Sequence, residues 1–215
     1  MFTKFTGLVL GTLMMAGSAS AATMSYTTAE TNPEIRLTLD DAAMPGSLRF
    51  SLSAISGFAD FLGLGFDYAG SRIAQDMIRL VGFDSTSNKP YTPALELFGD
   101  NTGAQSECGK GCNLKGNGGS GDTMFDYIVR IGQNGGGKNN VASVVFDIAG
   151  VDLVDFSNFA VRAQETSNGG SIKYGLNPDA PVPTPSPVPL PAAGFVLMAG
   201  LGALSVLRRR KPAAA

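Results

Sequence analysis

The feature that most constrains this fold is a two-residue alternation of apolar and polar side chains. Ile35, Leu37 and Leu39 alternate with Arg36 and Thr38. Successive side chains of a β-strand point to opposite faces, so this pattern predicts a strand with one buried face. The same alternation recurs in residues 48–52, 62–66, 125–131, 159–163 and 172–176. The chain therefore predicts several one-sided strands.

One further segment is apolar on both sides. Residues 141–148 carry Val141 and Val145 on one face and Val144, Phe146 and Ile148 on the other, which is typical of a central strand. Clusters rich in Gly, Pro and Asn separate the runs and indicate turns. Only residues 72–81 approach a helical period, and they predict either a short helix or another strand. Eight or nine short strands favour one antiparallel β-sandwich, jelly-roll-like, over residues 22–176.

Proline marks the end of this predicted domain. In residues 177–187 the prolines stand at nearly alternating positions, Pro181, Pro183, Pro185 and Pro187. Proline fixes φ and removes an amide donor, so such a segment is stiff and extended. We expect a Pro-rich stalk after the domain.

Residues 1–21 have the pattern of a secretory signal peptide. Lys4 is their only charge, an apolar run extends from Phe5 to about Ala16, and Ala19-Ser20-Ala21 follows. The small residues Ala19 and Ala21 suit signal peptidase, which would cut after Ala21. The alternative is an uncleaved N-terminal anchor, which the short apolar run disfavours.

A second targeting segment occupies residues 188–211. It joins a short motif, Val188-Pro189-Leu190-Pro191-Ala192, to an apolar run over residues 192–207 and a basic cluster, Arg208, Arg209, Arg210 and Lys211. As a helix the apolar run would extend about 24 Å, close to the hydrocarbon thickness of a membrane. The cations would stay on the cytoplasmic side and set the orientation.

This three-part tail resembles the VPLPA-CTERM sorting signal, a variant of the PEP-CTERM signals of Gram-negative bacteria. The resemblance covers residues 188–211 and carries the five motif residues unaltered. It implies that an exosortase cuts an inner-membrane intermediate at or near the motif. The body would then reach the cell surface or extracellular matrix, with exopolysaccharide as a candidate partner. An ordinary C-terminal transmembrane anchor behind a Pro-rich stalk is the alternative.

The charge of the remaining body limits its partners. Without Lys4 and the basic cluster, 11 of the 16 basic residues remain beside 18 acidic ones, a net charge of about −7. Such a body disfavours nucleic acid and anionic membrane surfaces as partners. It is compatible with divalent cations.

The two cysteines of the chain, Cys108 and Cys112, lie in the Gly- and Asn-rich residues 100–122. In an exported protein they predict one disulfide, because no histidine or further cysteine is present to complete a metal site. The spacing also departs from the Cys-x-x-Cys redox pattern. We expect an exposed, turn-rich insertion whose small disulfide loop stabilises the fold only slightly.

Catalysis is not indicated. Without histidine the chain lacks Ser-His and Cys-His nucleophile systems and His-ligated metals. A glycosidase needs only two carboxylates at a set separation, but no pattern fixes such a pair. The acids considered are Asp40, Asp41, Asp67, Asp84, Asp147, Asp152 and Asp155. We therefore predict no enzyme, no catalytic residue and no resident metal.

Calcium is the one cofactor that stays open. Residues 117–122 offer oxygen ligands but lack the spaced acids and closing glutamate of an EF-hand, so a solvated Gly-rich loop is favoured. Two classes of function follow. The first is a non-catalytic surface or matrix protein, and the alternative is a calcium-assisted glycan-binding module of lectin-like type.

Overall fold

The computed structural model describes residues 22–85, 92–100, 108, 112–114, 125–132 and 140–179. They form ten strands and two short 3-10 helices. The strands are β1 (Thr23–Thr27), β2 (Glu34–Met44), β3 (Ser47–Ser56), β4 (Asp60–Tyr68), β5 (Ile78–Ser85), β6 (Glu96–Gly99), β7 (Tyr127–Arg130), β8 (Val141–Ala149), β9 (Phe156–Gln164) and β10 (Ile172–Pro178). The 3-10 helices are η1 (Gln75–Met77) and η2 (Leu153–Asp155). In the described ranges no helix has the length and apolar character needed to cross a membrane.

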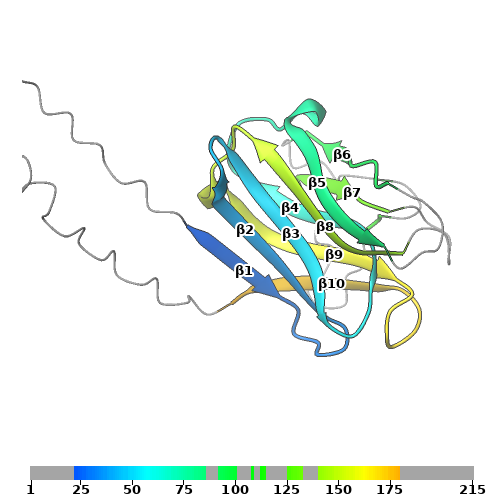
Figure 1. The fold of residues 1–215 in the computed structure, drawn as a ribbon. Coiled ribbons are helices and arrows are strands. Elements are labelled where there is room, and N and C mark those ends of the chain that lie inside the picture. Colours follow the sequence, from blue (N-terminus) through cyan, green and yellow to red (C-terminus); the bar gives the residue numbers. More distant parts are fainter. Residues whose placement is uncertain are drawn as a thin grey trace, which may run out of the picture. The chain divides into compact units, whose positions relative to one another are not determined.

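All ten strands belong to one antiparallel sheet that curls into a half-barrel (Figure 1). Their order is β5-β8-β3-β2-β1-β10-β9-β4-β7-β6. The two halves join where β1 pairs with the end of β10, through Tyr26 opposite Pro178 and Thr27 opposite Asn177. The predicted all-β, antiparallel class is confirmed. The sequence suggested two packed sheets, whereas the structure has one continuous sheet that bends.

The hydrophobic core fills the inside of the curl. The alternating residues of β2 and β3 are buried as predicted, with Ile35, Leu37 and Leu39 fully buried. Rings from opposite halves of the sheet meet there: Phe50 of β3 lies 5.2 Å from Phe156 of β9, measured between ring centroids. Burying one such side chain contributes about 1.5–3 kcal/mol, so the inward-facing side chains stabilise the curled sheet.

Three local predictions can be compared with the strands. β8 lies between β5 and β3, which confirms residues 141–148 as an interior strand. Residues 72–81 contain both predicted alternatives, since η1 is followed directly by β5. Asn177 and Pro178, assigned to the stalk from sequence, belong to β10. The contacts of the chain divide it after Asp179, three residues beyond the predicted domain end.

Gln75 protects one outer edge of the sheet. Its side-chain Nε2 donates to the carbonyl oxygen of Leu95 at 3.0 Å, and its Oε1 accepts from the amide of Leu97 at 2.7 Å. The side-chain amide thus takes the place of a neighbouring strand beside β6. Edge strands need such protection, because their free N–H and C=O groups otherwise pair with other chains.

Candidate functional site

The residues predicted to carry sorting lie outside the described part of the chain. These are Ala19 and Ala21, the motif Val188 to Ala192, and the basic cluster Arg208 to Lys211. The Gly-rich residues 117–122 also lie outside it. What the structure does describe is the folded domain, from Ala22, directly after the predicted signal peptide, to Asp179, with residues 180–187 between it and the sorting segment.

Asp179 is fixed to the domain by three interactions. Its amide donates to the carbonyl oxygen of Ser25 at 2.8 Å, and its carboxylate accepts from the hydroxyl of Thr27. Arg36 of β2 places its Nε 3.7 Å from the second carboxylate oxygen. Asp179, the last described residue, is therefore held by β1 and β2.

Ala22, the first described residue, is held by Asp41 of β2. Its nitrogen donates to Oδ1 of Asp41 at 2.8 Å, and its carbonyl oxygen accepts from the amide of Asp41 at 3.3 Å. This pair continues the β1–β2 ladder by one residue beyond Thr23 opposite Asp40. Ala22 is thus held by β2, and Asp179 by β1 and β2.

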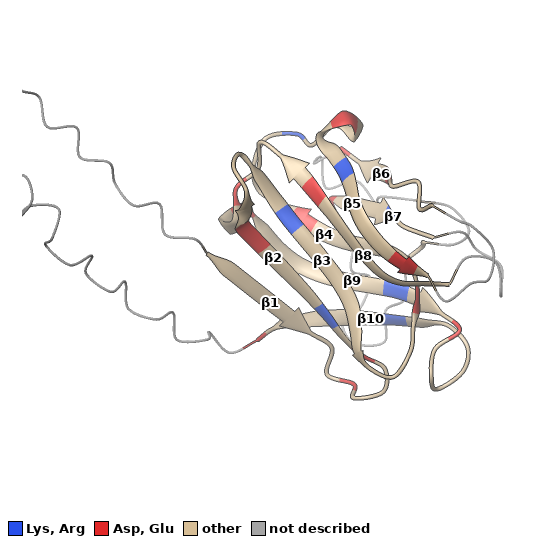
Figure 2. Cartoon of the chain, viewed as in Figure 1, with Lys and Arg blue, Asp and Glu red and all other residues tan. Residues whose placement is uncertain are grey.

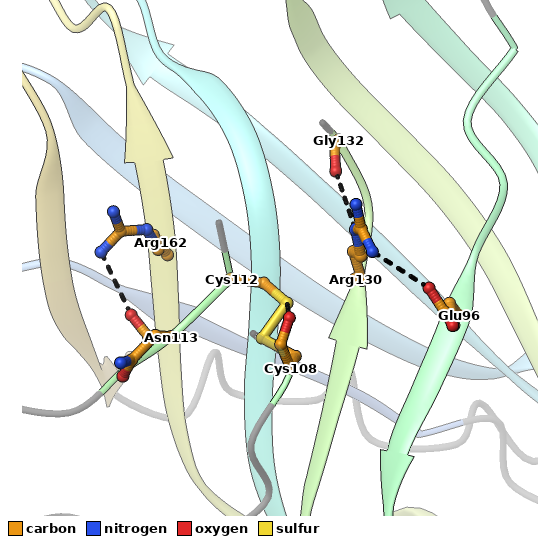
Figure 3. The surroundings of a disulfide bond; sticks show 7 residues. All are labelled: Glu96, Cys108, Cys112, Asn113, Arg130, Gly132 and Arg162. Carbon is orange, nitrogen blue, oxygen red and sulfur yellow. Dashed lines mark hydrogen bonds and ion pairs between the residues drawn. A yellow bond between two sulfur atoms is a disulfide. The ribbon is translucent and has the colours of Figure 1, made fainter. Parts of the chain in front are cut away.

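The cysteine segment forms a second apolar cluster on the outer face of the sheet. Cys108 and Cys112 lie at disulfide distance, with Cα atoms 5.6 Å apart, as predicted from sequence (Figure 3). Both are buried, together with Leu114, and they pack with Phe125, Ile128 and Ala160. The expectation of an exposed insertion is therefore wrong for Cys108, Cys112 and Leu114, whereas Asn113 is exposed.

Two glycines of β4 make this packing possible. A Cβ built on Gly63 would lie 2.8 Å from the Cβ of Cys112, and one on Gly65 would lie 2.4 Å from Cδ1 of Leu114. The residues that alternate with Leu64 and Phe66 are thus small because another segment covers them. Alternation alone could not distinguish this covered face from a solvated one.

A row of charged residues crosses the same outer face. In register, Glu96 of β6 lies opposite Arg130 of β7, and Arg162 of β9 lies opposite Lys173 of β10. Gly63 of β4 stands between the two arginines, so the disulfide lies between them (Figure 3). Arg130 pairs with Glu96 at 3.2 Å.

The other end of the row brings two cations together. Figure 2 shows one basic position in blue on each of the neighbouring strands β9 and β10, where Arg162 and Lys173 lie opposite each other. Burial lowers the pKa of Arg162, and burial followed by the charge of Arg162 lowers the pKa of Lys173. Arg162 donates to the carbonyl oxygen of Asn113 at 3.1 Å, while its Nε is buried without a hydrogen-bond partner among the described residues. Like charges directly opposite each other destabilise a strand pair, so this contact costs stability.

Two of the carboxylates considered from sequence, Asp67 and Asp147, are hydrogen bonded within the sheet. Asp67 accepts from the amide of Asp126 at 3.2 Å and from the side chain of Asn158 at 2.8 Å. Asp126 in turn accepts from the amide of Tyr68 at 3.0 Å. Asp147 forms two hydrogen bonds with Arg49, at 2.8 and 3.0 Å. Across the described ranges, no group of three or more acidic or cysteine side chains is arranged to hold a metal ion.

A fully buried carboxylate, Asp60, was not singled out from sequence. It accepts from the amide of Val141 at 2.7 Å and from the side chain of Gln164 at 2.8 Å, and so ties β4 to β8 and β9. Burial is the main cause that raises its pKa, although both hydrogen bonds act in the opposite direction. An acid within the apolar context Ala59-Asp60-Phe61-Leu62 was the available signal.

Comparison with protein-family models, curated proteins and solved structures finds no match to this chain. Function has to be inferred from the residues themselves.

Proposed function

We propose that this protein is a non-catalytic component of the cell surface or extracellular matrix, exported by its signal peptide and sorted by an exosortase. The observation that carries the proposal is the order of motif, apolar run and basic cluster in residues 188–211. Signal peptidase and exosortase are then its processing enzymes. Residues 192–207 hold the intermediate in the inner membrane before the second cut.

The contacts at Ala22 and Asp179 support this processing scheme. Ala22 is hydrogen bonded to Asp41 of β2 and Asp179 to Ser25 of β1, and the segments to be removed lie beyond them. Two cuts outside these residues leave the described hydrogen bonds and the core in place. The released body keeps its fold after processing.

The partners of the acidic side chains support a non-catalytic role. Asp60 is occupied by Val141 and Gln164, and Asp147 is occupied by Arg49. A catalytic carboxylate has to face substrate or water. The carboxylates of Asp60 and Asp147 are instead hydrogen bonded to residues of neighbouring strands.

We also propose that the curled sheet forms a two-layer β-sandwich, the architecture predicted from sequence. One layer is β5-β8-β3-β2-β1 and the other is β10-β9-β4-β7-β6. Ring contacts between the layers support this: Phe50 to Phe66 at 6.0 Å and Tyr26 to Phe159 at 4.6 Å between centroids. Such aromatic pairs are typical of a core between facing layers.

The intact mass of protein released from the surface of the native host tests the proposal. The expected chain begins at Ala22 and ends at or near Pro191 or Ala192. A released species that still carries Arg208 to Arg210 contradicts sorting by an exosortase.

A motif variant adds a matched control. Pro189→Ala with Pro191→Ala leaves the apolar run unchanged, so we expect the protein to accumulate in the inner membrane. Pro183→Ala with Pro185→Ala makes the same chemical change within the stalk and should leave sorting intact. Equal loss of sorting in both variants would point to the stiffness of the stalk instead of the motif.

The alternative, a calcium-assisted glycan-binding module, makes a different prediction. The mature protein on a glycan array would bind in calcium and lose binding in chelator. Under our proposal chelation leaves any binding, including binding to an exopolysaccharide, unchanged.

A further inference from the structure

The nitrogen of Ala22 occupies an unusual position, because the predicted signal peptidase cut falls directly before it. The nitrogen lies 2.8 Å from Oδ1 of Asp41. The amide of Asp41 also donates to the carbonyl oxygen of Ala22 at 3.3 Å. One residue of β2 therefore holds Ala22 through both its backbone and its side chain.

Cleavage changes the chemistry of this nitrogen. In the precursor it is a peptide nitrogen with a single N–H group. Hydrolysis of the Ala21–Ala22 bond adds the elements of water, leaving a carboxylate on Ala21 and an amine on Ala22. With an ordinary pKa of about 7.7–8.0, that amine takes up a proton near neutral pH and becomes an ammonium group.

We infer that Asp41 is the binding site for the new amino terminus, which it receives as an ammonium–carboxylate pair. The inference rests on the proposed export and cleavage after Ala21. The observed separation is that of a charge-assisted hydrogen bond, about 2.7–2.9 Å, so the pair forms without movement of either strand. Signal peptidase thereby converts a hydrogen bond between an uncharged amide and a carboxylate, at the start of β1, into an ion pair.

Among the charged groups near Ala22, Asp41 is the partner of the Ala22 nitrogen. Asp40, its neighbour on β2, accepts from the amide of Ala42 at 2.8 Å. Arg49 of β3 lies opposite Asp40 and is hydrogen bonded to Asp147. The helix η2, which also contacts β2, carries Asp155. Of the carboxylates among these groups, Asp41 is the one hydrogen bonded to the Ala22 nitrogen.

The position of the pair gives it a consequence for the fold. β1 is the strand through which the two halves of the sheet join, and it pairs with β10 over only two residues. The contacts at Asp179 hold one side of β1, and the pair at Ala22 holds the residue directly before β1 against β2. Maturation therefore strengthens the strand at which the sheet bends.

The pKa of the Ala22 amine in the mature protein tests this inference. Protein is isolated from the native host, its amino terminus is identified by mass spectrometry, and the rate of amine acylation is followed from pH 6 to 10. An exposed ion pair raises an amine pKa by about half a unit. We expect that shift in the wild type relative to Asp41→Asn, which keeps the backbone bond to Ala22. Asp40→Asn is the matched control and should retain the shift.

Each outcome decides the question. A first residue other than Ala22 overturns both this inference and the proposed cleavage site. An Ala22 terminus with equal amine pKa in wild type and Asp41→Asn overturns the inference alone. Equal effects of Asp41→Asn and Asp40→Asn would also overturn it, because a diffuse negative field would then explain the shift.

Discussion

Replacing Gly63 with alanine tests whether the cysteine segment packs on the outer face of β4. The new Cβ would lie 2.8 Å from the Cβ of Cys112, and 3.5 Å from both the Cα of Cys112 and the carbonyl oxygen of Val129. Ordinary carbon–carbon contacts are about 3.5–4.0 Å, so Cys112 has to move by roughly 1 Å. Side-chain rotation does not move a Cβ atom, so the backbone of Cys112 has to shift, and the bond to Cys108 restrains that shift.

The expected magnitude follows from two opposing effects. Overpacking of a filled site costs about 1–3 kcal/mol. Replacement of glycine by alanine lowers the entropy of the unfolded chain and returns about 0.4–1 kcal/mol. We therefore expect Gly63→Ala to lower the free energy of unfolding by about 1–2 kcal/mol.

Gly82 of β5 provides the matched control. A Cβ built there meets no atom within 4 Å, and neither glycine has the positive φ that would strain an alanine. Gly82→Ala should therefore change stability by under about 1 kcal/mol, toward a gain. The assay is urea denaturation of oxidised protein covering residues 22–179, followed by circular dichroism.

A double-mutant cycle assigns the cost to the disulfide segment. In a background of Cys108→Ala with Cys112→Ala the segment is free to shift, so the cost of Gly63→Ala should fall by at least about 0.5 kcal/mol. Equal stability changes for Gly63→Ala and Gly82→Ala would refute the packing of Cys112 on β4. An unchanged cost in the open-disulfide background would assign it to the neighbouring strands instead.

Two further predictions concern the core. Val129 is fully buried, so Val129→Asp should prevent folding or cost several kcal/mol. Arg130→Asp should cost under about 1 kcal/mol, because the pair that it removes, Arg130 with Glu96, is exposed. Soluble yield and circular dichroism compare the two variants, and equal damage would contradict the opposite facing of Val129 and Arg130. Because burial raises the pKa of Asp60 in the folded state above the ordinary 3.8, its contribution to stability is full below about pH 3.8 and is lost as the pH rises through the folded pKa. Asp60→Asn, whose amide can still bond Val141 and a reoriented Gln164, should remove this slope in a series of urea denaturations across pH; an unchanged slope would assign it to another group.

The sequence alone determined the strand class and the inward-facing residues. Ile35, Leu37 and Leu39 are fully buried because alternation is a local property, set by the two-residue period of one extended segment. The cysteine pairing was also predictable, since the predicted export and the cysteine count constrain it without reference to the fold. Residues 1–21 and 188–211 are likewise local signals, and their roles stay predictions.

The tertiary structure decided which strands meet and what their outer faces contact. Nothing near Asp179 in sequence indicates Ser25, Thr27 or Arg36 as its partners, and nothing near Gly63 indicates Cys112. Such contacts depend on strand order and register, which join residues far apart in the chain. A periodic pattern specifies which face of a strand is buried, but the same pattern is compatible with many neighbours, and only the packing of the whole core selects among them.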